Sequence, residues 1–422
     1  MVKLRDIGRL VRDAWLVVGM TVLLFCLLEG GVSLASLIKR RVTGSEQSTL
    51  WDKRFKADTY ADRSWARAYY AELQRAWELR WSSYVYYRRK PFHGKHINVD
   101  RQGLRATTAL PPRLRAQGTP VKIFMFGGST LWGTGARDAH TIPSILAGEL
   151  QKSGLRPEIT NFGETGYVST QGVITLLLQL RNGHRPDLVI FYDGVNDTFS
   201  AYQQRAAGLP MNEFNRAREF NLGAASQYKQ RRAMVVRDVV NSLSTVRLLT
   251  SLLRRAGAFA EARTVAHRPL HDDLASDTGS GGQRVVDMYL GNVELVRALG
   301  EHYDFKCLFY WQPTIFQKAH LTKYERGERR KAEYVAPFFQ ETYAAVRQRP
   351  LAQQDEHLVH DLSLVFSDVR EPIFIDWHHL GETGNELIAR RMADDVLGVI
   401  AAGPDERGAA AGVDSGGGRP KN

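Results

Sequence analysis

An almost unbroken apolar run, DLVIFYDGVND over residues 187–197, restricts the fold of this chain more than any other feature. Parallel strands that helices cover on both faces read as continuous hydrophobic segments, whereas half-exposed strands alternate. The run ends in Gly194, Asn196 and Asp197, residue types that close turns and begin helices. The segment therefore predicts a central parallel strand in an α/β domain.

Further short apolar segments predict the rest of a sheet. We expect strands at about 121–126, 158–162, 187–192, 305–311 and 373–375. Apolar residues at helical spacing predict helices between them, at about 142–152, 171–182, 285–300, 330–347 and 384–400. This alternation implies right-handed crossovers and a doubly wound, five-stranded parallel sheet.

Four short segments at the ends of these elements carry residues that suit one reaction. They are GGST with Ser129, NFGETG with Gly166, GVND with Asn196, and DWHH with Asp376 and His379. Each segment alone is an ordinary turn. Open α/β sheets bind ligands at the carboxyl ends of their strands, so we expect the four segments to meet there.

Together these residues supply what acyl transfer needs. A serine hydroxyl is a weak nucleophile, so Ser129 requires a base; His379 can take its proton, and Asp376 can fix the tautomer of the imidazole. The oxyanion of the transition state requires preorganised donors, predicted to be the N–H groups of Ser129 and Gly166 and the side-chain amide of Asn196.

Neighbouring polar residues have simpler interpretations. His378 competes with His379 for the role of base, but the Asp-x-x-His spacing and the following Leu380 favour His379. Asp193 and Asp197 are interpreted as turn-forming carboxylates beside Asn196. The pair His357 and His360, at a spacing that fits one helix face, lacks the His-Glu-x-x-His zinc pattern. No cofactor and no metal site are predicted.

The four segments resemble blocks I, II, III and V of the SGNH (GDSL-like) hydrolases, over roughly residues 120–400. The resemblance implies a flavodoxin-like sheet, serine esterase activity on ester bonds, and functional roles for Ser129, Gly166, Asn196 and His379, with Asp376 as the triad acid. Block I departs from the usual form because Gly128 stands where aspartate is common. The Gly-x-Ser-x-Leu context also lacks the second glycine of the α/β-hydrolase elbow.

A second feature is the apolar run AWLVVGMTVLLFCLL, which continues less strictly to Ile38. It exceeds the roughly 20 helical residues that span a bilayer. A carboxylate at mid-bilayer would cost about 3 kcal/mol, so we expect the span to begin near Val11 and Glu29 to lie toward an interface. A cleaved signal peptide is the alternative, since small residues stand at Ser33 and Ala35.

A retained helix would make the protein a single-pass membrane protein. Basic residues flank the run on both sides, so the positive-inside rule does not decide its orientation. A short amino-terminal segment usually stays inside, which places the catalytic domain on the extracytoplasmic side.

The expected organisation has four parts: a membrane anchor (1–45), a juxtamembrane lead-in (46–119), the hydrolase domain (120–400) and a disordered tail (401–422). Residues 50–82 fit a helix with aromatic and charged faces. Gly103-Leu104-Arg105 resembles the lead-in of membrane-linked bacterial SGNH hydrolases and predicts a β-hairpin near the site. A helical insertion, 200–285, is interpreted as a lid, a membrane-surface helix or an extra packed helix.

The net charge of +12 does not imply nucleic acid, because no nucleic-acid module is present. Attraction to anionic lipid or to an acidic polysaccharide is the alternative. Cys26 and Cys307 do not suggest a disulfide.

The sequence predicts an esterase that removes O-acyl, chiefly O-acetyl, groups from a cell-envelope or exported glycan. Three alternatives remain: an O-acyltransferase that uses the same triad, a lipid esterase or lysophospholipase, and a non-catalytic scaffold in polysaccharide assembly. The oligomeric state cannot be read from the sequence.

Overall fold

The structure is a computed structural model that describes residues 4–42, 52–108, 119–221, 236, 239–255, 281–349 and 358–401. The chain divides into two compact units. The first comprises Met1–Trp51 and Phe214–Arg268, and the second comprises Asp52–Glu213 and Pro269–Asn422. All the predicted catalytic residues belong to the second unit. The tail predicted to be disordered lies, apart from Ala401, outside the described residues.

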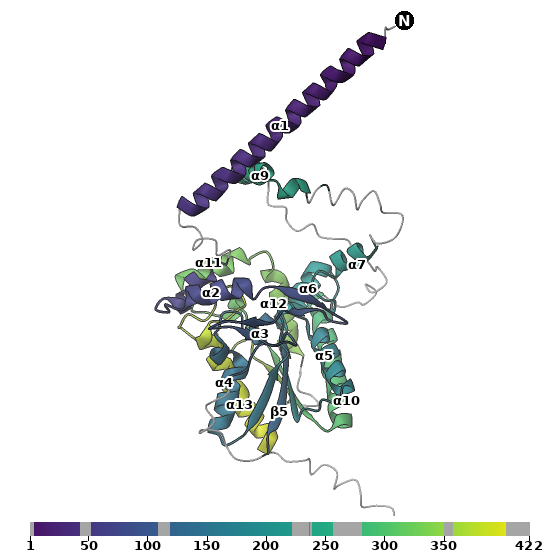
Figure 1. The fold of residues 1–422 in the computed structure, drawn as a ribbon. Helices are drawn as coiled ribbons and strands as arrows, with labels where there is room; N and C mark the ends of the chain where they lie inside the picture. The colour runs from purple at the N-terminus through teal and green to yellow at the C-terminus, as the bar shows by residue number, and fades with distance from the viewer. Residues whose placement is uncertain are drawn as a thin grey trace, which may run out of the picture. The chain divides into compact units, whose positions relative to one another are not determined.

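The second unit is built on a parallel sheet of five strands (Figure 1). The strands are β5 (Val121–Gly127), β6 (Pro157–Asn161), β7 (Leu188–Asp193), β8 (Lys306–Trp311) and β9 (Val359–Asp361). Their spatial order is β6-β5-β7-β8-β9, and all neighbours are parallel. Numbered along the chain this is the order 2-1-3-4-5, the doubly wound flavodoxin-like arrangement. The predicted fold class is confirmed.

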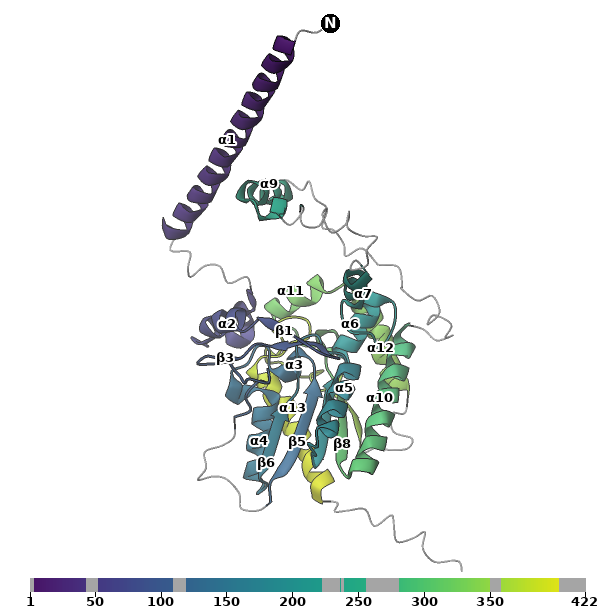
Figure 2. The same cartoon turned by 45° about the vertical axis from the view of Figure 1, so that its right-hand side comes forward.

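Helices cover both faces of the sheet (Figures 1 and 2). On one face lie α4 (Ile142–Lys152) and α13 (Glu382–Ala401), and on the other lie α5 (Ser169–Arg181), α10 (Gly281–Tyr303) and α12 (Ala336–Gln348). Successive residues of β7 point to opposite faces, so Ile190 packs with the first group and Phe191 with the second. All six residues of β7 are buried, as its unbroken apolar run predicts.

Two predictions near the carboxyl end, one of a strand and one of a helix, are wrong. Residues 373–375 form no strand of the sheet, and Phe374 makes only an isolated bridge to Leu380. These apolar side chains are buried in a loop whose Ile373 and Phe374 N–H groups donate to Glu325. The fifth strand is instead β9, where His360 pairs with Tyr310. A short edge strand with polar residues has little hydrophobic signal, and it was mistaken for a helix face.

The helix predicted at 330–347 is two helices, α11 (Lys323–Lys331) and α12. Pro337 stands in the first turn of α12, where its missing N–H leaves no helical hydrogen bond unmade, and the helical structure is interrupted before it. The helix α13 begins at Glu382, and within it the Glu386 carboxylate accepts from Arg390.

The lead-in is mixed and only partly helical. It contains the short helices η1 (Arg54–Lys56), η2 (Asp58–Tyr60) and α2 (Ala66–Arg75), followed by two hairpins, β1 (Leu79–Ser82) with β2 (Tyr86–Arg89) and β3 (Phe92–His93) with β4 (Asn98–Val99). Arg105, at the end of this segment, donates to the carbonyls of Gly133 and Ala136 at 2.6 Å each. The predicted hairpin is therefore attached to the turn that follows Ser129.

The described part of the first unit consists mainly of α1 (Leu4–Val42) and α9 (Ser244–Arg255). Within α1, Arg12–Ile38 is 27 residues long with a mean hydropathy of 2.0, enough to cross a bilayer. An apolar helix near the amino terminus can also belong to a signal sequence. The helix α7 (Glu213–Asn221) runs along the chain from the second unit into the first.

Candidate active site

The structure brings Ser129, His379 and Asp376 together in one hydrogen-bonded chain. Nε2 of His379 lies 2.6 Å from the Ser129 hydroxyl, and Nδ1 of His379 lies 2.7 Å from a carboxylate oxygen of Asp376. Ser129 begins the short helix α3 (Ser129–Trp132) directly after β5, and its side chain is buried. The contacts join residues that lie 250 positions apart in the chain.

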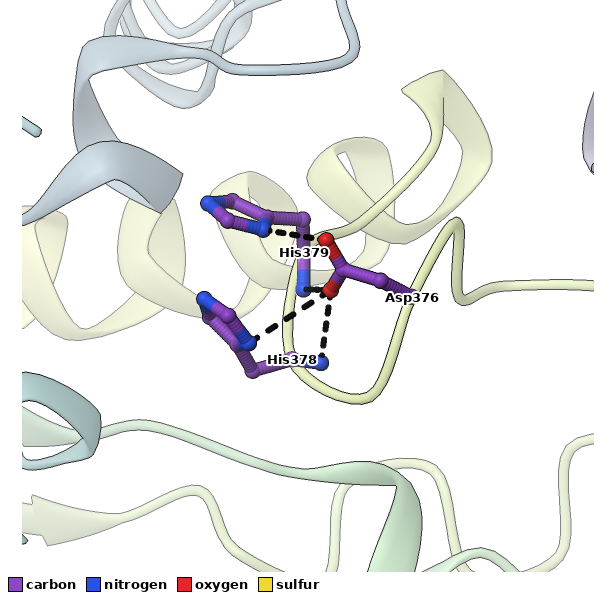
Figure 3. Close-up of side chains that lie close together, drawn as sticks. All are labelled: Asp376, His378 and His379. Carbon is purple, nitrogen blue, oxygen red and sulfur yellow. Dashed lines mark hydrogen bonds and ion pairs between the residues drawn. The ribbon is translucent and has the colours of Figure 1, made fainter. Parts of the chain in front are cut away.

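The spacing of the DWHH segment has a local structural reason. One oxygen of Asp376 accepts from the backbone N–H groups of His378 at 2.9 Å and His379 at 2.7 Å (Figure 3). The Ile375 N–H donates to the His379 carbonyl at 3.0 Å, which closes the turn. The other Asp376 oxygen is left to bind the imidazole of His379. A turn with two residues between the aspartate and the histidine allows both contacts at once.

His378 occupies a different place from His379 (Figure 3). Its ring packs between Trp377 and His379, with centroid separations of 4.1 and 3.9 Å. Burial lowers the pKa of His378 to about 3, so this ring is neutral at physiological pH. Of the two rings, it is that of His379 that contacts the Ser129 hydroxyl.

Arg54 is a site residue that sequence reasoning missed. Its guanidinium donates at 2.8 Å to Oδ2 of Asp376, the oxygen that also binds the His379 imidazole, and Nη1 of Arg54 lies 3.2 Å from Nδ1 of His379. Asp52 holds Arg54 from the other side at 2.6 Å. Arg54 lies 322 positions before Asp376, and no local pattern in the sequence links the two.

The charges around the triad acid keep it ionised. Burial by itself would raise the pKa of Asp376, but the His379 imidazole, through its charge and its hydrogen bond, and the Arg54 guanidinium hold it well below its usual value. Burial likewise opposes the charge of Arg54, yet Asp376 and Asp52 raise its pKa well above the ordinary one. Asp376 therefore stays an acceptor for the His379 Nδ1–H.

The two predicted oxyanion residues beyond the serine are Gly166, in the loop between β6 and α5, and Asn196, in the first turn of α6 (Val195–Gln204). Gly166 has φ +76°, and a Cβ there would stand 3.1 Å from the Tyr87 hydroxyl and 3.3 Å from the Met211 sulfur. Both the conformation and the space favour glycine. Asn196 donates its amide to the Tyr167 carbonyl at 2.7 Å. This bond ties the Asn196 side chain to the residue after Gly166.

Gly128 explains the unusual form of block I. A Cβ at this position would lie 2.2 Å from the amide nitrogen of Asn196. The backbone of Gly128 is extended, with φ −85°, so its conformation alone does not require glycine. The absent side chain instead makes room for the Asn196 amide beside Ser129.

A buried ion pair supports the loop that carries Gly166. Arg89, on β2, donates to Glu164 at 3.1 Å, and both side chains are fully buried. Glu164 also accepts from the Thr165 N–H at 2.7 Å, and Arg89 donates to the Thr165 hydroxyl. The Arg89 guanidinium lies 4.6 Å from the ring centroid of Trp132. Arg89 of the lead-in thus holds the NFGETG segment, which carries Gly166, in place.

The carboxylates beside Asn196 differ from each other. Asp197 accepts from the Ser169 N–H and hydroxyl and from the Gly194 N–H, the turn-forming role that was predicted. Asp193 is buried, and one of its oxygens has no hydrogen-bond partner among the described residues. Burial and the nearby Asp197 raise the pKa of Asp193 well above its usual value.

Asp376, His378 and His379 are close enough to share a metal ion, with ligand atoms within 4.8 Å of one another. The arrangement suits a proton relay better than a cation. Both ring nitrogens of His379 have partners, and the Arg54 guanidinium already binds the carboxylate. A cation here would face that fixed positive charge.

Residues 123–392 match the family model described as GDSL-like Lipase/Acylhydrolase. Among curated proteins, none has a significantly similar sequence. Among solved structures, the chain matches the acetyl xylan esterase AlAXEase, at 16% identity over 65% of this chain and 100% of that one, with a TM-score of 0.32.

A lipolytic protein of the G-D-S-L family from Veillonella parvula DSM 2008 is 13% identical over 67% of this chain and 98% of its own, with a TM-score of 0.33. The acetylxylan esterase Axe2 from Geobacillus stearothermophilus is 12% identical over 67% and 95%, with a TM-score of 0.32. Likeness at this level carries no information about substrate.

The family model covers most of the second unit's sheet and all four catalytic segments. The chain belongs to the GDSL-like lipase and acylhydrolase family, as the resemblance of its four blocks indicates. It is an enzyme of the ester-hydrolysing class.

Proposed function

We propose that this enzyme hydrolyses O-acyl esters, chiefly O-acetyl esters of a cell-envelope or exported glycan, through an acyl-enzyme at Ser129. The observation that carries the chemistry is the unbroken hydrogen-bonded chain from the Ser129 hydroxyl through His379 to Asp376.

In the first half-reaction, the Ser129 oxygen attacks the ester carbonyl carbon while Nε2 of His379 takes the hydroxyl proton. The tetrahedral intermediate collapses, the imidazolium returns the proton to the departing sugar oxygen, and the acyl group stays on Ser129. In the second half-reaction, His379 deprotonates a water molecule, whose oxygen attacks the acyl carbon. The second tetrahedral intermediate collapses, the bond between the acyl carbon and the Ser129 oxygen breaks, and the imidazolium returns its proton to that oxygen, which releases the free acid and restores the enzyme. Asp376 keeps the Nδ1 proton in place throughout.

The oxyanion is held by the N–H groups of Ser129 and Gly166 and by the Asn196 amide. The Asn196 amide nitrogen carries two hydrogens, and the Tyr167 carbonyl accepts one of them. The second is directed to the oxyanion in this mechanism. Because the Tyr167 bond fixes the amide before substrate arrives, the donor needs no reorganisation in the transition state.

Two features support a short acyl group on a sugar. The Tyr87 hydroxyl and the Met211 sulfur lie close to Gly166, so the space beside that glycine is narrow. On the same ribbon, Trp81 and Tyr84 are exposed by 72% and 66% of their surface. Exposed aromatic faces with polar edges are suited to packing on sugar rings.

The substrate is tested by comparing acetyl, octanoyl and palmitoyl esters of one alcohol, and then acetylated polysaccharides, with Ser129→Ala as the control. We expect acetyl esters to be preferred and acetate to be released from the polysaccharide. Preference for the palmitoyl ester would contradict the proposal and favour a lipid esterase. Transfer of label to an added sugar instead of water would identify an acyltransferase.

We also propose that α1 anchors the protein in a membrane, with the catalytic unit on the extracytoplasmic side. The length and hydropathy of Arg12–Ile38 support an anchor. Protease added to intact cells should remove the catalytic unit from an anchored fragment. A catalytic unit degraded only after lysis would contradict the orientation.

A further inference from the structure

Glu29, the one carboxylate inside the apolar run of α1, has a specific partner. Its two oxygens accept from the first residues of α9: the Ser244 N–H at 2.5 Å, the Thr245 N–H at 3.0 Å and the Thr245 hydroxyl at 2.7 Å. The Ser33 hydroxyl, one turn further along α1, lies 2.8 Å from the Ser244 hydroxyl. Residues more than 210 positions apart thus form one polar contact within the first unit.

This contact matches the chemistry of both partners. The first N–H groups of a helix have no partner inside the helix and carry partial positive charge, so a carboxylate is a favourable cap. Glu29 supplies that carboxylate to α9 from another helix. In return, α9 compensates a charge that would otherwise be costly near hydrocarbon.

The position of the contact along α1 is that of a membrane boundary. Glu29 lies seventeen positions after Arg12, which corresponds to about 26 Å of helix at a rise of 1.5 Å per residue. The hydrocarbon core of a bilayer is about 30 Å thick. With Arg12 at one boundary, Glu29 and the amino terminus of α9 reach the other.

The rest of this helical segment presents aliphatic side chains outward. Large hydrophobic residues that are about half exposed or more include Val236, Val239, Leu248, Leu249 and Leu252. Arg247 is exposed as well, on the same helix. Short helices that combine exposed leucines with basic residues bind in the plane of an interface, where leucines enter the acyl boundary and arginines meet anionic headgroups.

We propose that α9 is an interfacial membrane helix, capped and held at the bilayer surface by Glu29 of α1. Residues 239–255 then form a second membrane contact of the chain, and α1 is a retained part of the mature protein instead of a cleaved signal. The proposal rests on the anchor proposed above and does not depend on the esterase chemistry.

The helix contact is tested in membranes by disulfide formation in the full-length chain, with Cys26 and Cys307 replaced by alanine. We expect the pair Ser33→Cys and Ser244→Cys to cross-link rapidly with a mild oxidant. Thr21→Cys with Ser244→Cys, more than three turns away along α1, is the matched control. Adding Glu29→Leu should reduce cross-linking several-fold. Cross-linking no faster than the control would overturn the contact.

The membrane contact is tested by attaching an environment-sensitive fluorophore to single cysteines and quenching it with spin-labelled lipids in anionic vesicles. Leu249→Cys should be quenched several-fold more than Arg247→Cys on the same helix. The native Cys26, as sole cysteine, reports the anchor. Quenching at Cys26 without quenching at position 249 would refute the inference while leaving the anchor intact. Absence of quenching at both positions would refute both, and hydrolysis of a soluble acetyl ester verifies that each variant is folded.

Discussion

Replacing Gly128 by alanine should inactivate the enzyme with little effect on its stability. The new Cβ would lie 2.2 Å from the Asn196 amide nitrogen, whereas ordinary contact begins at 3.4 Å, so the amide must move by about 1.2 Å. The obstructing atom is the end of a flexible side chain, and it can move. Its displacement, however, removes the proposed oxyanion donor.

The magnitudes separate the two effects. Loss of one oxyanion donor lowers kcat by about 100- to 1,000-fold, or roughly 3–4 kcal/mol of transition-state stabilisation. The accompanying loss of the hydrogen bond to Tyr167 costs about 1 kcal/mol of folding free energy. Gly128→Asp, which restores the common family residue, should be at least as damaging as Gly128→Ala because it adds bulk and charge.

A double-mutant cycle makes the reasoning refutable. Asn196→Ala alone should lose a similar factor in kcat, and adding Gly128→Ala to it should cost little more, since the obstructed atom is gone. Gly327→Ala, where a Cβ meets nothing within 4 Å, is the control and should keep kcat within about twofold. Wild-type kcat in Gly128→Ala, or fully additive losses in the double mutant, would refute the account.

Three further predictions concern buried charges. Arg54→Met should lower the free energy of unfolding by about 3 kcal/mol at neutral pH, because Asp376 loses its cation. The pKa of Asp376 is depressed in the folded protein, so the difference in unfolding free energy between wild type and variant should stay constant above about pH 5. Urea titrations should show this difference shrink only as the pH falls below 3.8, the usual pKa of an aspartate. Asp193→Asn should raise the melting temperature at pH 8, because the raised pKa of Asp193 means that its ionised form destabilises the folded protein. This gain in melting temperature should fade toward pH 4, and a gain that grows on acidification would contradict the prediction. Arg89→Met should cost about 4 kcal/mol by leaving Glu164 buried and unpaired, and adding Glu164→Gln should recover part of that loss in thermal unfolding.

The sheet could be predicted where hydrophobicity reports burial on both faces. β5, β7 and β8 are central strands, and their apolar runs mark them within a residue or two. The edge strand β9 could not be found this way, because it is three residues long and contains His360 and Asp361. The apolar stretch at 373–375 was mistaken for a strand because a buried loop also requires hydrophobic residues.

The sequence allowed the reactive groups of the candidate site to be predicted, but not the buried arginines that hold them in position. Ser129 and His379 stand in short motifs whose spacing reflects local turns. Arg54 and Arg89 act through contacts that only the folded chain creates, so a single sequence gives them no local signature. Glu29 is intermediate: its conflict with an apolar helix was visible, but the partner that resolves it was not.

The most direct test of the central claim is covalent labelling of the full-length enzyme with a fluorophosphonate, followed by peptide mass spectrometry. The account predicts one adduct, on Ser129, which is lost in His379→Ala and retained in His378→Ala. An unlabelled Ser129 in a folded protein, or an adduct on a different residue, would contradict it.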